Sequence, residues 1–242
     1  MTTPSSPLLI GCAAGFSGDR VDAAGPVVDT LIARGGPAFL IFETLAERTL
    51  ALAQLRRRAD PEAGYEPLLD DMLRPVLARC LQYGIRIVSN FGAANPRAAA
   101  CHIQRMAGEL GLAPPRIAVV GGDDVSGVQH RALLREQLGG AIDNIRMVSA
   151  NAYIGAEAIA AALDQDAQVL VLLPETLAAV RNARANRLAH RLAALGVGPD
   201  QRSLLRLPFG SPLAQGDGGT EAHHPPVRGV VAVADDHGLN GV

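Results

Sequence analysis

A chain of 242 residues is long enough to bury a hydrophobic core, and 48% hydrophobic with 19% charged residues is typical of a folded globular protein. The formal net charge of −2 gives no strong attraction to nucleic acid or to an anionic membrane, so we expect neither as a partner. All 22 basic side chains other than histidine are arginine, which excludes Schiff-base chemistry, a pyridoxal phosphate lysine and the lysine of a Walker-type phosphate loop.

The ends and the cysteines of the chain indicate its compartment. No apolar run approaches the length that spans a bilayer, and the first six residues lack the basic start and apolar stretch of a signal peptide. We therefore expect a cytoplasmic protein. Cys12, Cys80 and Cys101 lack metal-ligand spacing, so buried reduced thiols are the favoured interpretation. A reactive thiol at Cys12 is the alternative.

Strands and helices alternate along about the first 170 residues. Short apolar runs predict strands at 8–10, 38–42, 85–89, 116–120, 145–149 and 168–173. The clearest helix covers 68–81, where apolar side chains repeat at i, i+1, i+4 and i+5 around Pro75. Asn95 is the expected N-cap of the next helix, with Pro96 in its first turn. This alternation predicts an α/β fold with a mostly parallel sheet and flanking helices; an open doubly wound sheet is favoured over a barrel-like arrangement.

The composition changes after Pro174, so we expect an α/β core domain at 1–173 and a different segment at 174–242. Residues 175–195 are predicted to form one long helix with a stripe of arginines. The last 35 residues contain seven glycines and four prolines, which is typical of a loose tail. Residues 230–233 are expected to add one edge strand at most.

Glycine-rich or polar segments follow the first three predicted strands, where parallel sheets bind their ligands. The first strand runs into the turn 11–20, the second into Glu43 and the third into Asn90. The turn has the spacing G-x-x-x-G-x-x-G, which differs from the dinucleotide fingerprint. Glu43 nevertheless lies where a nucleotide fold carries its ribose-binding acid. A nucleotide site and a close-packed turn without phosphate both remain open.

Two carboxylates suit acid–base chemistry. Glu43 and Glu47 are four residues apart, so both can face the same side of the helix that follows the second strand. Arg48 can hold an anionic substrate through a forked contact. Paired carboxylates suit proton abstraction beside a thioester carbonyl when one of them is desolvated. A capped, solvated first helical turn is the alternative.

Amides and aspartates follow the later strands as well. We expect Asn90 to contact a ligand and Asn95 to cap a helix, while Asn151 follows the fifth predicted strand. Asp123 and Asp124 offer hard oxygens to a divalent cation, but a turn is the favoured interpretation, and no metal site is predicted.

Five segments occur in the order found in a known family: GCAAGFSGDR at 11–20, FETLAERTLALAQ at 42–54, NFGAANP at 90–96, GDDV at 122–125 and SANAYIGA at 149–156. Over about residues 7–170 the chain thus resembles the acyclic terpene utilisation (AtuA) family. The resemblance implies a bacterial, cytosolic protein of catabolic clusters that degrade citronellol- and geraniol-type chains as acyl-CoA thioesters. The family continues with a TGRVADP-like loop where this chain has LLPET at 172–176, a departure that indicates a truncated, frameshifted or replaced C-terminal half.

The leading hypothesis is an enzyme acting on a branched acyl-CoA or a related small anion, with Glu43 and Glu47 as the catalytic acid–base pair. The predicted substrate-binding residues are Gly11, Gly15, Phe16, Ser17, Gly18, Asp19, Arg20, Arg48, Asn90, Asn95, Asp123, Asp124 and Asn151. No cofactor is identified. The alternatives are a non-catalytic ligand-binding or assembly subunit, completed by a second copy or a partner subunit, and a nucleotide-dependent oxidoreductase.

Overall fold

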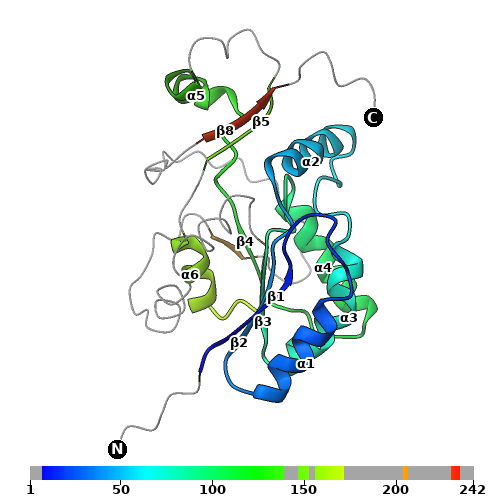
Figure 1. Ribbon diagram of the computed structural model, residues 1–242. Coiled ribbons are helices and arrows are strands. Elements are labelled where there is room, and N and C mark those ends of the chain that lie inside the picture. The colour runs from blue at the N-terminus through cyan, green and yellow to red at the C-terminus, as the bar shows by residue number, and fades with distance from the viewer. Residues whose placement is uncertain (1–6, 139–146, 153–155, 172–203, 207–229, 235–242) are drawn as a thin grey trace, which may run out of the picture.

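The computed structural model describes residues 7–138, 147–152, 156–171, 204–206 and 230–234 (Figure 1). Its main sheet has the strand order β1-β2-β3-β6-β4-β7 and is not closed into a barrel. The first five strands in this order run parallel, and β7 is antiparallel to β4. The bounds are β1 Leu9–Ala14, β2 Ala38–Phe42, β3 Arg86–Ser89, β4 Ile117–Val120, β6 Val169–Val171 and β7 Leu204–Arg206. The predicted open, mostly parallel sheet is confirmed.

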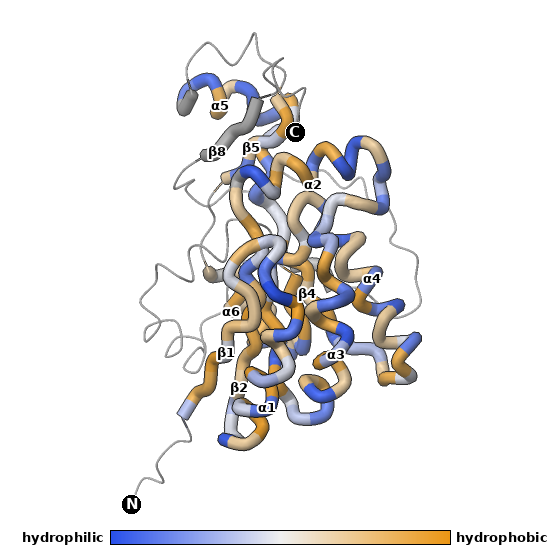
Figure 2. The backbone as a smooth tube through the Cα atoms, turned by 45° about the vertical axis from the view of Figure 1, so that its right-hand side comes forward, coloured by the Kyte–Doolittle hydropathy of each residue, from blue (hydrophilic) through white to orange (hydrophobic). Residues whose placement is uncertain are grey.

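Helices cover both faces of this sheet. On one face pack α1 (Ala24–Arg34), α3 (Leu69–Gln82) and α4 (Pro96–Glu109), and on the other packs α6 (Glu157–Asp164). Side chains alternate along each strand, so Leu40 and Phe42 of β2 join the first core while Phe39 joins the second. Figure 2 shows the apolar residues concentrated in the strands of the sheet. The arrangement is the predicted α/β fold.

The helix predicted at 68–81 is α3, and its apolar residues are buried as the repeat requires. The same burial raises the pKa of the Cys80 thiol to about 12, which keeps it protonated and unreactive. Cys12 is exposed and Cys101 half-buried, so the expectation of buried thiols is correct for Cys80 and wrong for Cys12. None of the three forms a disulfide.

The first strand is longer than predicted, because it continues through Gly11 to Ala14. A Cβ atom on Gly11 would lie 2.4 Å from Cγ1 of Val27 in α1. Glycine is therefore needed here for close packing of the strand against the helix, and the turn begins only after Ala14.

The fifth predicted strand does not join the main sheet. β5 (Met147–Ala152) pairs antiparallel with β8 (Val230–Ala234) in a separate two-stranded sheet, and β6 takes the place between β3 and β4. β8 is the strand expected at 230–233, whereas β7 was not predicted. The helix predicted at 175–195 lies outside the described residues, as does most of the predicted tail.

Three further helices lie near the carboxyl ends of the strands. α2 (Glu47–Ala59) follows β2, and Nη2 of Arg58 donates hydrogen bonds to the backbone carbonyls of Met147 and Val148 in β5. The 3₁₀ helix η1 (Val128–His130) and α5 (Arg131–Leu138) follow β4. In the part of the chain that the structure describes, every helix is too short or too polar to cross a membrane.

Candidate functional site

Glu43 and Asn90 follow the neighbouring strands β2 and β3, and their side chains meet inside the protein. Phe42 and Phe91, the residues next to them, are fully buried with ring centroids 4.9 Å apart, which fixes the two strand ends relative to each other. Glu43 is 7% exposed and Asn90 is fully buried. Nδ2 of Asn90 donates to Oε1 of Glu43 at 2.7 Å.

The backbone of the next residues completes this contact. The amide of Leu45 also donates to Oε1 of Glu43, at 3.0 Å. Oδ1 of Asn90 accepts from the amide and the hydroxyl of Thr44, at 2.7 and 3.1 Å. No described residue binds the second oxygen of Glu43, Oε2. The carboxylate is therefore held by one oxygen and open at the other, as a proton acceptor requires.

A second buried carboxylate, Glu66, lies beside the same segment. Its backbone amide donates to the carbonyl of Phe91 at 2.8 Å, and the residue is 4% exposed. Oε2 of Glu66 accepts from the hydroxyl of Ser17 at 2.8 Å, and Oε1 accepts from the amide of Leu68 at 3.1 Å. We call Ser17, Glu43, Thr44, Glu66 and Asn90 the carboxylate cluster.

Sequence reasoning missed Glu66 and Thr44. Glu66 lies just before α3, where an acidic residue reads as a helix-start charge, and its partner Ser17 is 49 residues away in the chain. Thr44 lies inside a segment that resembles the family, next to Glu43, and that position was the only sign of its role.

The turn after β1 is largely closed on itself. The carboxylate of Asp19 accepts from the amides of Gly15 and Arg20, at 2.8 and 2.7 Å, and these backbone hydrogen bonds lower the pKa of Asp19. Arg20 forms a bidentate, exposed ion pair with Asp22. Gly18 has a φ of +85°, and Phe16 is 58% exposed. Of the predicted turn residues, Ser17 is the one that reaches the carboxylate cluster.

Of the predicted catalytic pair, the structure describes the side chain of Glu43 but not that of Glu47. Glu47 is the first residue of α2, and its side chain lies outside what the structure describes. Arg48 is exposed and forms no hydrogen bond or ion pair with a described residue.

A cavity of about 310 Å³ lies at the carboxyl ends of β3 and β4. It is lined by Gln54, Arg57, residues 93–97, residues 121–124 and Asn151. The connection after β3 leaves through α4 on one face of the sheet, and the connection after β4 reaches β6 through α6 on the other. The cavity thus lies at a topological switch point, where consecutive connections leave the sheet on opposite faces. Open α/β sheets usually bind their ligands at such a point. We call it the switch pocket.

Four of the predicted site residues line this pocket: Asn95, Asp123, Asp124 and Asn151. Asn95 caps α4 as predicted, since its Oδ1 accepts from the amide of Ala98, and its Nδ2 donates to the carbonyls of Pro61 and Ala63. Oδ1 of Asp124 accepts from the amide and hydroxyl of Ser126, which is the expected turn.

Asp123 and Asn151 form the buried end of the pocket. They are 0% and 2% exposed, and Nδ2 of Asn151 donates to Oδ2 of Asp123 at 3.1 Å. Oδ1 of Asn151 accepts no hydrogen bond from a described residue. Across the described ranges, no three histidine, cysteine, aspartate or glutamate side chains are grouped as metal ligands.

The wall of the pocket contains a strained residue. Ala93 has a φ of +41°, in a region that residues with a Cβ rarely adopt. The loop is fixed there because the amide of Ala94 donates to the carbonyl of Gly64, and Nη1 of Arg57 donates to the carbonyl of Ala94 at 2.8 Å. Such strain persists only where the surroundings enforce it, and it concentrates at functional sites.

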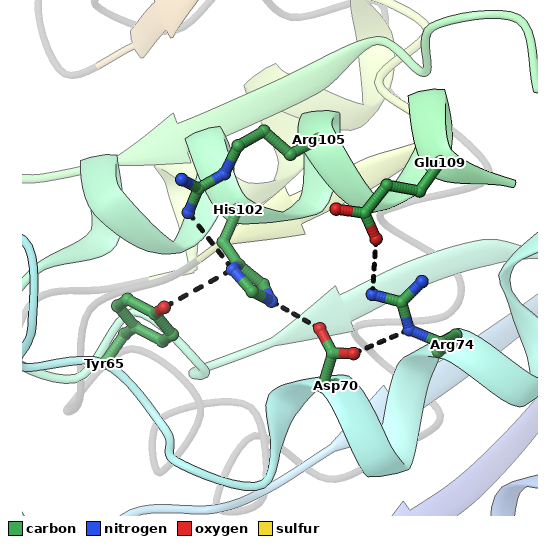
Figure 3. Close-up of polar contacts among 6 residues, drawn as sticks. All are labelled: Tyr65, Asp70, Arg74, His102, Arg105 and Glu109. Carbon is green, nitrogen blue, oxygen red and sulfur yellow. Dashed lines mark hydrogen bonds and ion pairs between the residues drawn. The ribbon is translucent and has the colours of Figure 1, made fainter.

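A third polar group joins the outer surfaces of α3 and α4 (Figure 3) and consists of Tyr65, Asp70, Arg74, His102, Arg105 and Glu109. His102 of α4 contacts Asp70 of α3 through Nε2, and Arg74 bridges Asp70 and Glu109. These contacts are helix-to-helix, so we assign this group a structural role.

Comparison with known proteins identifies the family of the chain. No curated protein and no solved structure matches the chain. A family model described as acyclic terpene utilisation family protein AtuA matches residues 8–172, a range that contains the carboxylate cluster and the switch pocket. The chain belongs to the acyclic terpene utilisation (AtuA) family.

Proposed function

We propose that this protein is an enzyme of branched acyclic terpene breakdown and that Glu43 moves a proton on an acyl thioester, such as a branched acyl-CoA. The observation that carries the proposal is the state of the Glu43 carboxylate. Its Oε1 is fixed by Asn90 and Leu45, and its Oε2 is bound by no described residue. Family membership supports the role in terpene utilisation, and the buried carboxylate supports the chemistry.

The proposed step needs only the substrate and the carboxylate. The C–H bond beside the thioester carbonyl breaks, the proton goes to Oε2 of Glu43, and the electron pair delocalises onto the carbonyl oxygen. Return of the proton to the same or a conjugated carbon completes the step. Burial excludes water and strengthens the electrostatic interactions of the carboxylate, while Asn90 keeps it from rotating.

A nucleotide-dependent oxidoreductase is supported less well by these contacts. The amides of Gly15 and Arg20, which would face a phosphate in the turn, already donate to Asp19. Gly11 lies in the strand and packs against α1. These residues favour the closed turn over a dinucleotide site.

The test is exchange of hydrogen for deuterium at the carbon beside the thioester carbonyl. A saturated branched acyl-CoA is incubated in D₂O with and without the protein, and its mass is followed with time. We expect the protein to accelerate uptake of deuterium. If the acyl-CoA binds in calorimetry but exchanges at the rate seen in buffer, the enzyme proposal fails and the non-catalytic binding subunit replaces it.

A further inference from the structure

We propose that the switch pocket binds a hydroxyl-bearing phosphate ester of the size of a small sugar phosphate, with its hydroxyls at the buried end and its phosphate at the mouth. This site is separate from the carboxylate cluster and does not depend on proton transfer by Glu43. The proposal rests on which polar groups lining the pocket lack partners within the protein.

The buried end of the pocket requires a hydrogen-bond donor. Asn151 is 2% exposed, and its Oδ1 accepts no hydrogen bond from the described residues. Gln54 is 8% exposed, and its side-chain amide makes no hydrogen bond with any described residue. A buried polar group without a partner is costly, so Oδ1 of Asn151 indicates a missing donor, and the unbonded amide of Gln54 beside the same cavity is available to the same ligand. One hydroxyl of the ligand would donate to Oδ1 of Asn151, and a second would donate to Oε1 of Gln54 or accept from its Nε2.

The mouth of the pocket requires an anion. Arg97 is the second residue of α4, is exposed, and forms no hydrogen bond or ion pair with a described residue. Arg57 uses Nη1 to hold the carbonyl of Ala94, and its other N–H groups bind no described residue. Both arginines line the pocket together with Pro96, the first residue of a 14-residue helix, and the dipole of a helix favours negative charge at its N-terminus. Arginine pairs with phosphate through forked hydrogen bonds.

The two ends must be occupied by one molecule. A bare sugar would leave the arginines without partners, and a bare phosphate would leave the buried amides without donors. The cavity of 310 Å³ has the volume of about ten water molecules, which suits a phosphorylated small sugar.

Isothermal titration calorimetry of the full chain tests this inference with ribose 5-phosphate, ribose and inorganic phosphate as probes. We expect ribose 5-phosphate to bind at least about tenfold more tightly than either of the other two, since each satisfies only one end of the pocket. Equal binding of inorganic phosphate and ribose 5-phosphate would reduce the pocket to an anion site and overturn the proposal. No heat with any of the three would overturn it as well.

Two variants locate the site, and two serve as controls. Arg97→Gln and Gln54→Leu should each weaken ribose 5-phosphate by about tenfold without lowering the melting temperature, because neither side chain is hydrogen-bonded within the described protein. Arg56→Gln removes an exposed arginine of the same helix as Gln54 that does not line the pocket, and it should bind as the parent does. Glu43→Gln should also bind normally, which separates this proposal from the proposed function. Unchanged affinity in Arg97→Gln and Gln54→Leu would overturn the assignment.

The phosphorylated ribose can be a free metabolite or part of a larger molecule such as coenzyme A, and competition separates the two sources. Displacement of ribose 5-phosphate by coenzyme A assigns the pocket to a phosphorylated ribose within a larger ligand. Lack of displacement assigns it to a free sugar phosphate. Both results uphold the shared chemistry, provided that Arg97→Gln weakens whichever molecule binds.

Discussion

At the scale of single residues, the position of one amide sets the chemistry of one carboxylate. Asn90 donates to Oε1 of Glu43 and accepts two hydrogen bonds from Thr44, so its side chain cannot rotate without breaking buried contacts. Sequence reasoning expected Asn90 to bind a ligand. That expectation stays a prediction; in the structure its amide orients the carboxylate of Glu43, the proposed acid–base residue, and we regard Asn90 as a positioning residue.

The substitution Asn90→Asp tests this role by replacing the amide donor with a second carboxylate beside Glu43. The variant loses the hydrogen bond that holds Oε1 of Glu43 and places a second negative charge beside it. The maximal proton-exchange rate should fall while the affinity for the acyl-CoA stays near that of the parent. An equal loss of rate and affinity, together with a lower melting temperature, would show that Asn90 serves the fold alone.

At the scale of secondary-structure elements, β1 and α1 approach closely at Gly11. A Cβ atom there would lie 2.4 Å from Cγ1 of Val27 and 3.2 Å from Cδ1 of Leu31. We expect Gly11→Ala to lower the free energy of unfolding by about 1–3 kcal/mol through overpacking, measured by urea unfolding. Gly108→Ala in α4 is the matched control, because no atom outside its own helix and chain neighbours lies within 4 Å of the added methyl group, and it should stabilise the protein slightly. Equal stability of the two variants would contradict the close packing.

The contact between α3 and α4 makes a prediction about pH. Hydrogen bonds from Arg74 and then from His102 lower the pKa of Asp70 in the folded protein. A depressed carboxyl pKa adds stability above the ordinary aspartate pKa of about 3.9, and this stability disappears as the pH falls through the folded value. Asp70→Asn should therefore destabilise the protein at pH 7, by about 0.5–1 kcal/mol for this partly exposed group, and the difference should shrink in acid. Urea unfolding at neutral and acidic pH measures both values, and a difference that is constant with pH would refute the assignment.

The elements that local pattern determines were predictable, and those that depend on distant pairing were not. The apolar repeat of α3 and the cap at Asn95 are read within a few neighbouring residues. The partner of β5 is β8, and no pattern in either strand specifies that pairing. For the same reason Glu43 could be predicted from its place after a strand, while Glu66 could not, because its role comes from Ser17, a distant residue.

At the scale of the whole molecule, the main sheet and the two-stranded sheet differ in how they are supported. β3 and β6 each have a strand on both sides and helices on both faces. β5 has β8 as its ladder partner, and on its other side a short bridge to residues 123–125 adds two backbone hydrogen bonds. A two-stranded sheet is marginally stable on its own, so it should open locally before the core does. We expect backbone amides at 147–152 to exchange with deuterium at least about tenfold faster than those at 86–89 and 169–171. Equal protection in mass spectrometry would show that the two sheets unfold as one unit.

The rate of proton exchange in Glu43→Gln tests the central claim most directly. Glutamine keeps the shape of the side chain but cannot take up the proton, so exchange into a branched acyl-CoA should fall by about 10²- to 10⁴-fold, the usual contribution of a general base. Glu62→Gln is the matched control, because Glu62 is exposed and its side chain makes no hydrogen bond with a described residue. The account predicts loss of exchange in Glu43→Gln and parental exchange in Glu62→Gln. Parental exchange in a folded Glu43→Gln protein would contradict it.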